Sequence, residues 1–212
     1  MDIKVKKGWD DITLKQYEDI VSIQQCDDSY DDLINKGAEI LKVVYGVDGM
    51  SIAYNDFLTL TKTLDFFKHP IVPKKVRNTY TLNGNQYQLN TNFNDFTTAQ
   101  YVDFQNYKKR NDYVGMLSVV MIPKGHQYCD GYDNEQVMDD LCNLPITDAM
   151  GVLSFFLTCS FNSTKFLIRC SLRKLTRNKK MAKETKKELK ERMKEMEAMI
   201  TELYHISSHI AK

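Results

Sequence analysis

The sequence predicts a mainly α-helical protein with one β-hairpin, built from two related helical units and a long C-terminal helix. Three observations predict this fold. A nine-residue motif beginning at Asp11 occurs again at Asp95, an Asn-Gly pair at Asn83 stands between alternating residues, and an apolar stripe with heptad-like spacing runs through the C-terminal end. We expect an N-terminal helical unit over 1–75, the β-hairpin over 76–92, the second helical unit over 93–164 and the basic, amphipathic C-terminal helix over 165–212.

The first helix has a complete start signal. Thr13 can cap the helix while Gln16, three residues later, bonds back to it, and Ile12 before the cap can pack on Tyr17. We therefore expect a helix over 14–25.

Two more helices complete the first unit. Ser29 is the expected cap of the second helix, which ends before Gly46 and has apolar residues three, four and seven apart. The third helix is expected over 54–67, where Pro70 and Pro73 prevent its continuation.

The segment from Tyr80 to Leu89 changes to a period of two. A two-residue turn at Asn83-Gly84 places Tyr80 opposite Tyr87 and brings Leu82 and Leu89 to the same side. Because an isolated hairpin is marginally stable, that side is expected to pack on helices.

The second unit begins with the repeated motif. Residues 95–103 follow the pattern of 11–19, Asp-apolar-Thr-x-x-Gln-Tyr-x-Asp, with Phe96 placed to pack on Tyr101. The apolar segment 117–122 then corresponds to 41–45. We interpret the two units as a tandem duplication; the alternative is chance agreement, because capping boxes are common.

A strongly apolar helix is expected over 148–161. It is apolar on nearly all sides, so it should be buried or lie at an interface. Its candidate protein-contact residues are Phe155, Phe156 and Leu157.

The C-terminal part separates charge from apolar residues. Segment 165–187 contains ten Lys or Arg and one acid, so the rest of the chain carries a net charge of −8. Cations recur there every three or four residues and could contact either phosphates or an acidic protein surface; these candidates are Arg169, Arg173, Arg177 and Lys180. The apolar stripe that follows is expected to pack on its own domain or on neighbouring copies, and its candidate contact residues are Met193, Met196, Ile200 and Leu203.

Composition excludes several protein classes. With 42% hydrophobic residues, the chain is not largely disordered. We expect a soluble cytosolic protein, because no apolar run is long enough for a membrane span and no signal peptide is recognisable. The cysteines are unevenly spaced, which predicts reduced thiols: Cys26, Cys129, Cys142, Cys159 and Cys170.

The sequence predicts no enzyme, no catalytic residues, no cofactor and no metal. It contains neither a phosphate loop nor a dinucleotide fingerprint nor a nucleophile elbow. His126, Cys129 and Cys142 lack zinc-finger spacing, and His205 with His209 would need a third metal ligand.

Several segments in the same order resemble structural and assembly proteins of Bacteroides phages, over roughly Trp9 to Phe156. They are Trp9–Tyr17, Tyr80–Leu89, Thr97–Asp103, Ile122–Gly125 with Tyr128, and Asp148–Gly151 with Phe155 and Phe156. The chain most resembles virion proteins of crAss-like, short-tailed phages, including tail-associated and cargo proteins. These residues are caps, turns and packing positions, so the resemblance transfers no catalytic residue.

The resemblance implies a non-enzymatic virion structural protein of the tail or neck. It would be made in the bacterial host cytoplasm and would pack in multiple copies against other phage structural proteins. One alternative is a cytosolic tail-assembly chaperone that leaves before maturation. A second alternative is a DNA-binding accessory protein that uses segment 165–187.

Overall fold

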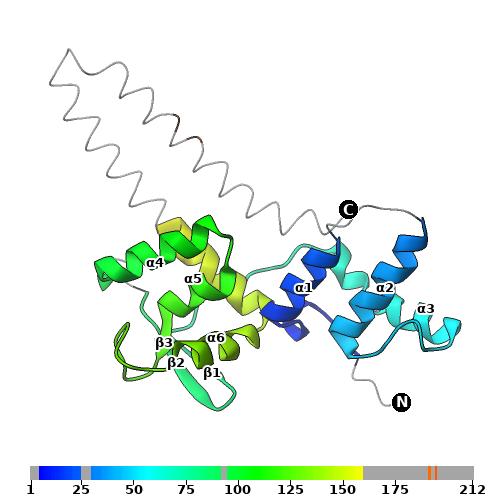
Figure 1. Cartoon of the computed structure of the whole chain (residues 1–212), viewed down its shortest axis with the longest axis horizontal. Helices are drawn as coiled ribbons and strands as arrows, with labels where there is room; N and C mark the ends of the chain where they lie inside the picture. The colour runs from blue at the N-terminus through cyan, green and yellow to red at the C-terminus, as the bar shows by residue number, and fades with distance from the viewer. Residues whose placement is uncertain (1–4, 25–29, 92–94, 160–190, 192–193, 195–212) are drawn as a thin grey trace.

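The computed structural model describes residues 5–24, 30–91, 95–159, 191 and 194, and within them the fold is mainly helical, as predicted (Figure 1). Two units lie side by side, one with α1–α3 and one with α4–α6 and a small sheet. In chain order the elements are η1 (Trp9–Asp11), α1 (Leu14–Gln24), α2 (Tyr30–Tyr45), α3 (Tyr54–Lys62), η2 (Asp65–Lys68), β1 (Thr79–Leu82), β2 (Asn85–Leu89), α4 (Thr98–Lys109), α5 (Tyr113–Val120), β3 (Met121–Pro123), α6 (Asn134–Cys142) and a helix over residues 146–159.

Both predicted capping boxes are confirmed. The Thr13 amide donates to Gln16 Oε1 at 3.1 Å, and the Gln16 amide donates to Thr13 Oγ1 at 3.2 Å. The same pair of bonds joins Thr97 and Gln100, at 3.0 and 3.2 Å. Each box satisfies backbone donors that a helix start leaves without partners.

Each unit has three helices after its capping box, and the duplication stays a prediction. Helices α1, α2 and α3 follow one another in the first unit, and α4, α5 and α6 in the second. The units differ in two places: β3 lies between the second and third helices of the second unit, where residues 46–53 of the first contain no strand, and the helix over 146–159 follows α6, whereas η2 follows α3.

The second helix ends as predicted, whereas the third is shorter than predicted. Gly46 adopts a left-handed φ of 68° and its amide donates to Lys42 O, which closes α2. Helix α3 ends at Lys62 because the following amides bond three residues back instead of four, and η2 continues the chain. This tighter turn places Phe67 against Trp9, with ring centroids 4.9 Å apart.

The hairpin is confirmed, and a third strand extends it. Asn83 and Gly84 both have positive φ, and Tyr80 lies opposite Tyr87. The inward side chains Tyr80, Leu82, Tyr87 and Leu89 are all buried. Strand β3 pairs antiparallel with β2, so the sheet order is β1-β2-β3. The sequence did not reveal β3, because its three residues continue an apolar run that began in α5.

Backbone hydrogen bonds join the two units. The Leu14 amide donates to Leu144 O at 2.8 Å, and the Ile146 amide donates to Ile12 O at 2.9 Å. Between these bonds, Thr13 forms an isolated antiparallel bridge with Pro145. The start of α1 is thus held by the turn that follows α6.

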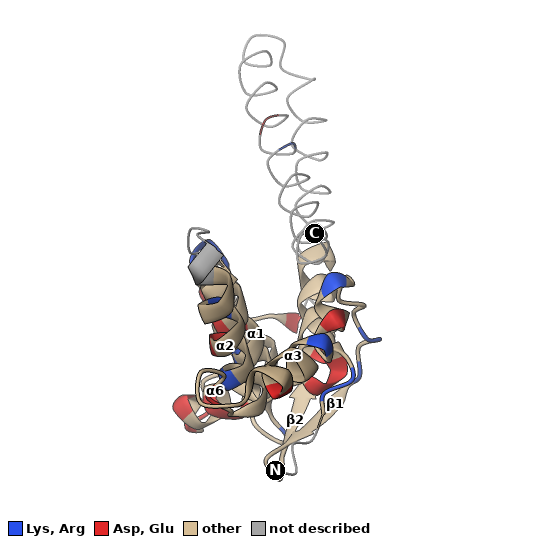
Figure 2. Cartoon of the chain, turned by 90° about the vertical axis from the view of Figure 1, so that its right-hand side faces the viewer, with Lys and Arg blue, Asp and Glu red and all other residues tan. Residues whose placement is uncertain are grey.

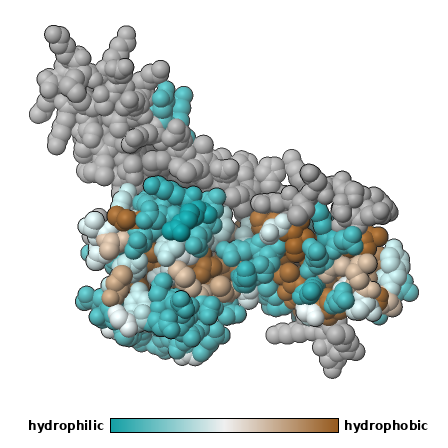
Figure 3. Space-filling model, viewed as in Figure 1, coloured by the Kyte–Doolittle hydropathy of each residue, from teal (hydrophilic) through white to brown (hydrophobic). Residues whose placement is uncertain are grey.

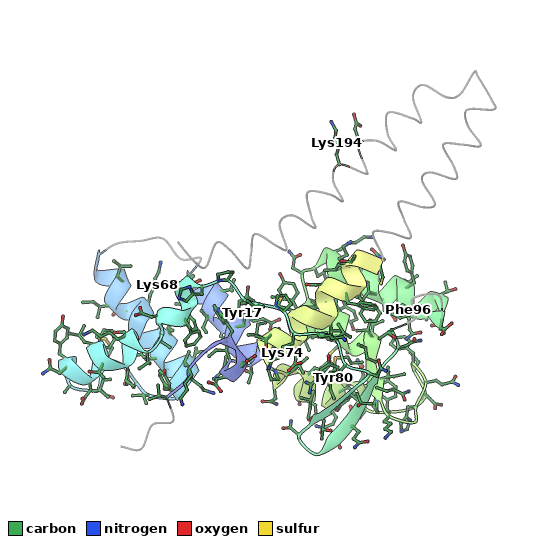
Figure 4. All side chains as sticks on the ribbon, turned by 180° about the vertical axis from the view of Figure 1, so that it is seen from behind. Tyr17, Lys68, Lys74, Tyr80, Phe96 and Lys194 are labelled. Atoms are coloured by element: carbon green, nitrogen blue, oxygen red, sulfur yellow. The ribbon has the colours of Figure 1, made fainter. Side chains whose placement is uncertain are left out.

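Lys74 lies where the units meet, as Figure 4 shows. Its amide donates to Thr147 O at 2.9 Å, and its ammonium lies 2.7 Å from Asp10 Oδ1. Arg77 pairs with Asp148 at 2.9 Å. One continuous set of buried apolar side chains runs through both units, from Trp9 and Tyr17 to Phe156. The connecting chain is therefore part of the packed body.

Among the described helices, none has the length and apolar composition needed to cross a bilayer.

Candidate functional site

The apolar helix over 146–159 is part of the core, so the predicted interface there is wrong for two of its three residues. Phe156 is fully buried and stacks on Phe96, with centroids 5.5 Å apart, and Leu157 is also buried. Phe155 is half-buried and packs edge-on against Phe156. The helix is apolar on nearly all sides because most of its residues are buried in the core.

The other predicted contact residues lie outside the described residues. These are the basic candidates Arg169, Arg173, Arg177 and Lys180 and the apolar candidates Met193, Met196, Ile200 and Leu203.

A different apolar surface is present on the first unit. Five of the nine exposed large hydrophobic residues found in the described part of the chain lie on α2, on α3 or between them. Their exposed fractions range from 37% to 69%. Brown, apolar residues reach the surface of this unit on the face drawn in Figure 3. We call these residues the α2–α3 surface: Leu33, Ile34, Met50, Tyr54 and Leu58.

The sequence did not distinguish this surface from the core. Leu33 and Ile34 follow the same apolar spacing as buried Leu41, so the helical pattern assigns all three to one face. Helix α2 has 16 residues but its neighbour α1 has 11, so α1 covers only part of it. Gly37 brings α2 close to α3, because a Cβ there would lie 3.1 Å from the Phe57 ring.

The second unit contains a pocket of about 440 Å³ between the sheet and the start of α6. Tyr87, Pro123 and Val137 form apolar parts of its lining, and the rings of His126 and Tyr132 meet edge-to-face, 5.9 Å apart. Its polar lining residues are Asn85, Gln86, Lys124, Asp133 and Gln136. A cavity that combines apolar walls with a few converging polar groups is typical of a binding site.

The pocket wall is fixed by a buried carboxylate. Asp140 has no exposed surface and accepts hydrogen bonds from Asn83 Nδ2 at 2.8 Å, Asn85 Nδ2 at 2.7 Å and Gln136 Nε2 at 3.1 Å. It also accepts a hydrogen bond from the Tyr87 hydroxyl. Four neutral donors thus surround the carboxylate, and they tie the hairpin turn to α6.

These contacts shift two pKa values in opposite directions. Burial alone would raise the pKa of Asp140, but its hydrogen bonds from Asn85, Tyr87, Asn83 and Gln136 outweigh burial and lower it. Burial raises the pKa of Tyr87, and the bond to Asp140 raises it further. Asp140 is therefore a carboxylate and Tyr87 a phenol at neutral pH.

The loop between β3 and α6 shapes the outer side of the pocket. Three of its residues, Gly125, Cys129 and Gly131, have positive φ, so the loop turns sharply. The Tyr128 hydroxyl donates to Asp103 Oδ2 at 2.8 Å, which attaches the loop to α4. At the end of the loop, Asp133 caps α6 by accepting from the amides at positions 135 and 136.

The structure brings no metal-ligating set together in its described part: no group of three or more His, Cys, Asp or Glu there is placed to hold an ion. Cys129 is exposed, whereas Cys142 and Cys159 are half-buried thiols whose pKa is raised by burial. The lining of the pocket offers hydrogen-bonding side chains, aromatic rings and charged groups.

No protein-family model matches the chain, and no curated protein or solved structure is significantly similar to it.

Proposed function

We propose that this chain is a non-enzymatic structural protein of a phage virion, located in the tail or neck, which packs in multiple copies against other phage structural proteins. The α2–α3 surface is the observation that carries the proposal. Its five apolar side chains are exposed, whereas Leu41, Val44 and Leu60 on the same two helices are buried. Exposed apolar residues gathered on neighbouring elements are typical of protein-contact surfaces.

The rigidity of the two units supports the same function. The capping boxes, the backbone bonds around Leu14 and Ile146, and the Asp140 cluster hold the helices in fixed positions. A rigid body presents a contact surface without losing conformational entropy on binding. The part of the proposal that assigns the chain to a phage virion rests on its resemblance to virion proteins of crAss-like phages.

Mass spectrometry of purified particles and of infected-cell lysates tests the proposal. We expect peptides of this chain in particles that have been purified through a density gradient, at a fixed ratio to the other tail proteins. Absence from such particles would contradict it. Presence in lysates together with absence from particles would instead select the assembly-chaperone function.

A further inference from the structure

We propose that the pocket between β2, β3 and α6 receives an arginine side chain from the basic segment 165–187 of a second copy of this chain. This inference rests on the proposed function, because it names a contact through which copies associate. Four properties of the pocket support it: its acceptors, its rings, its charge and its position.

The acceptors are oriented by Asp140. Asn85 and Gln136 line the pocket, and each has its side-chain nitrogen hydrogen-bonded to the buried carboxylate, at 2.7 and 3.1 Å. An amide whose nitrogen is held in this way offers its oxygen to a ligand. Two fixed amide oxygens match a donor group such as guanidinium, which has five N–H donors and no acceptor.

Aromatic rings form another part of the lining. Tyr132 and His126 meet edge-to-face, so one ring can present its face to a ligand while the other supports it. A planar guanidinium stacks on such a face, whereas an anion is repelled by it. The rings therefore favour a cation over a carboxylate or phosphate.

The α6 side of the pocket lining is negative. Asp133 is the carboxylate of the lining and Lys124 is its cation. Lys124 donates to Gln86 Oε1 at 3.0 Å, on the strand side of the pocket, while Asp133 lies on the α6 side. Figure 2 marks the acidic and basic residues along the described ribbon. A cation that enters from the α6 side is attracted by the Asp133 carboxylate.

The basic segment 165–187 of the chain contains arginine residues that could enter such a pocket. Segment 165–187 has ten Lys or Arg against one acid, and the rest of the chain carries a net charge of −8. Opposite charges on two parts of one sequence favour head-to-tail contact between copies.

The position of the pocket favours a second copy over the same copy. The helix over 146–159 runs away from the sheet and ends beside α4, whereas the pocket lies at the hairpin side of the unit (Figure 1). The basic segment begins six residues after residue 159. The last described residues of this helix therefore lie on the far side of the unit from the pocket.

Sedimentation velocity of the full chain at low and at high salt tests the contact. The pocket variant combines Tyr132→Ser with Asp133→Asn, which removes a ring and a charge but leaves a good helix cap. The segment variant combines Arg169→Glu, Arg173→Glu and Arg177→Glu. We expect salt-sensitive self-association of the wild type, and roughly fivefold to tenfold weaker association of either variant.

An equimolar mixture of the two variants gives the sharpest result. The segment variant has an intact pocket and the pocket variant has an intact segment, so one contact per pair can form. We expect stronger association in the mixture, as heterodimers, than in either variant alone at the same total concentration. Asp130→Asn, which removes an acid outside the pocket lining, is the matched control and should associate like the wild type.

Three outcomes would overturn the inference: a wild type that remains monomeric at low salt, a pocket variant that associates as strongly as the wild type, or equal effects of Asp130→Asn and the pocket variant. In each case the chain can still be a virion component, so the particle composition tests the proposed function separately.

Discussion

Gln16 and Gln100, the third residues of two helices that begin 84 positions apart, make the same long-range contact. Gln16 Nε2 donates to Val43 O in α2 at 2.9 Å, and Gln100 Nε2 donates to Val119 O in α5 at 3.2 Å. Each glutamine therefore both completes a capping box and ties its helix to the end of the next one. This shared contact supports the duplication hypothesis beyond the agreement of the motif itself.

Replacing Gln100 by Glu separates the two roles. A glutamate keeps the acceptor of the capping box but has no donor for Val119 O, and it places a charge at a site that is 5% exposed. We expect a loss of about 2 kcal/mol in the free energy of unfolding, measured by urea denaturation. Asn106→Asp on the exposed side of α4 is the control for the added charge. A Gln100→Glu variant as stable as its control would refute the importance of the contact.

Replacing Asp140 by Asn disrupts the buried cluster at its centre. The nitrogen of the introduced amide would face other donors, so two or more of the four hydrogen bonds would be lost in a site closed to water. We expect a loss of about 3 kcal/mol in unfolding free energy. Asp139→Asn, at a neighbour that is not buried, should change it by less than about 0.5 kcal/mol. Similar losses of unfolding free energy in both variants would show that the hydrogen bonds to Asp140 do not stabilise the fold.

The same cluster predicts an acid-sensitive fold. The pKa of Asp140 lies below its ordinary value in the folded chain, so its stabilisation is complete above the unfolded pKa of about 4 and is lost as pH falls through the folded pKa. Urea midpoints measured from pH 5 down to about 2 should therefore fall more steeply for the wild type than for Asp140→Asn. The urea midpoint of the variant should still fall somewhat with pH, because Lys74 and Thr147 also lower the pKa of Asp10. Parallel curves would contradict this assignment.

Replacing Gly151 by Ala tests the close packing between the units. A Cβ at residue 151 would lie 2.2 Å from Lys74 O, a backbone atom that cannot rotate away. We expect a loss of about 3 kcal/mol, measured by thermal and urea unfolding. Gly8→Ala is the control, since a Cβ at Gly8 meets nothing within 4 Å. Equal stability of the two variants would mean that the Lys74 segment is not held as the structure shows.

Local signals in the sequence predicted the local structure well. The capping residues Thr13 and Thr97 and the turn at Asn83-Gly84 act through neighbours a few positions away, so their outcome does not depend on the rest of the chain. Strand β3 depends on its pairing with β2, and the 3-10 turn after Lys62 depends on packing against Trp9. Both partners are distant in sequence, so no local pattern predicts these two elements.

The candidate sites were harder to predict for the same reason. Apolar spacing assigned Phe156 to a contact surface and Leu33 to a core face. In the structure Phe156 is buried and Leu33 is exposed. An apolar residue looks the same in sequence whether its partner is in the same chain or in another. Asp140 likewise reads as one acid among several in α6, because its donors Asn83, Asn85 and Tyr87 lie more than 50 residues away.

If the α2–α3 surface serves assembly instead of folding, as we propose, a surface variant should fold normally and still be missing from particles. Leu33→Ser combined with Tyr54→Ser should leave the free energy of unfolding within about 0.5 kcal/mol of the wild type, because both side chains are exposed. Val72→Ser, at a residue that is 73% exposed elsewhere, is the matched control. Quantitative mass spectrometry of purified particles should find the control at the wild-type copy number and markedly less of the double variant. Equal copy numbers of the wild type and the stable double variant would refute an assembly role for this surface.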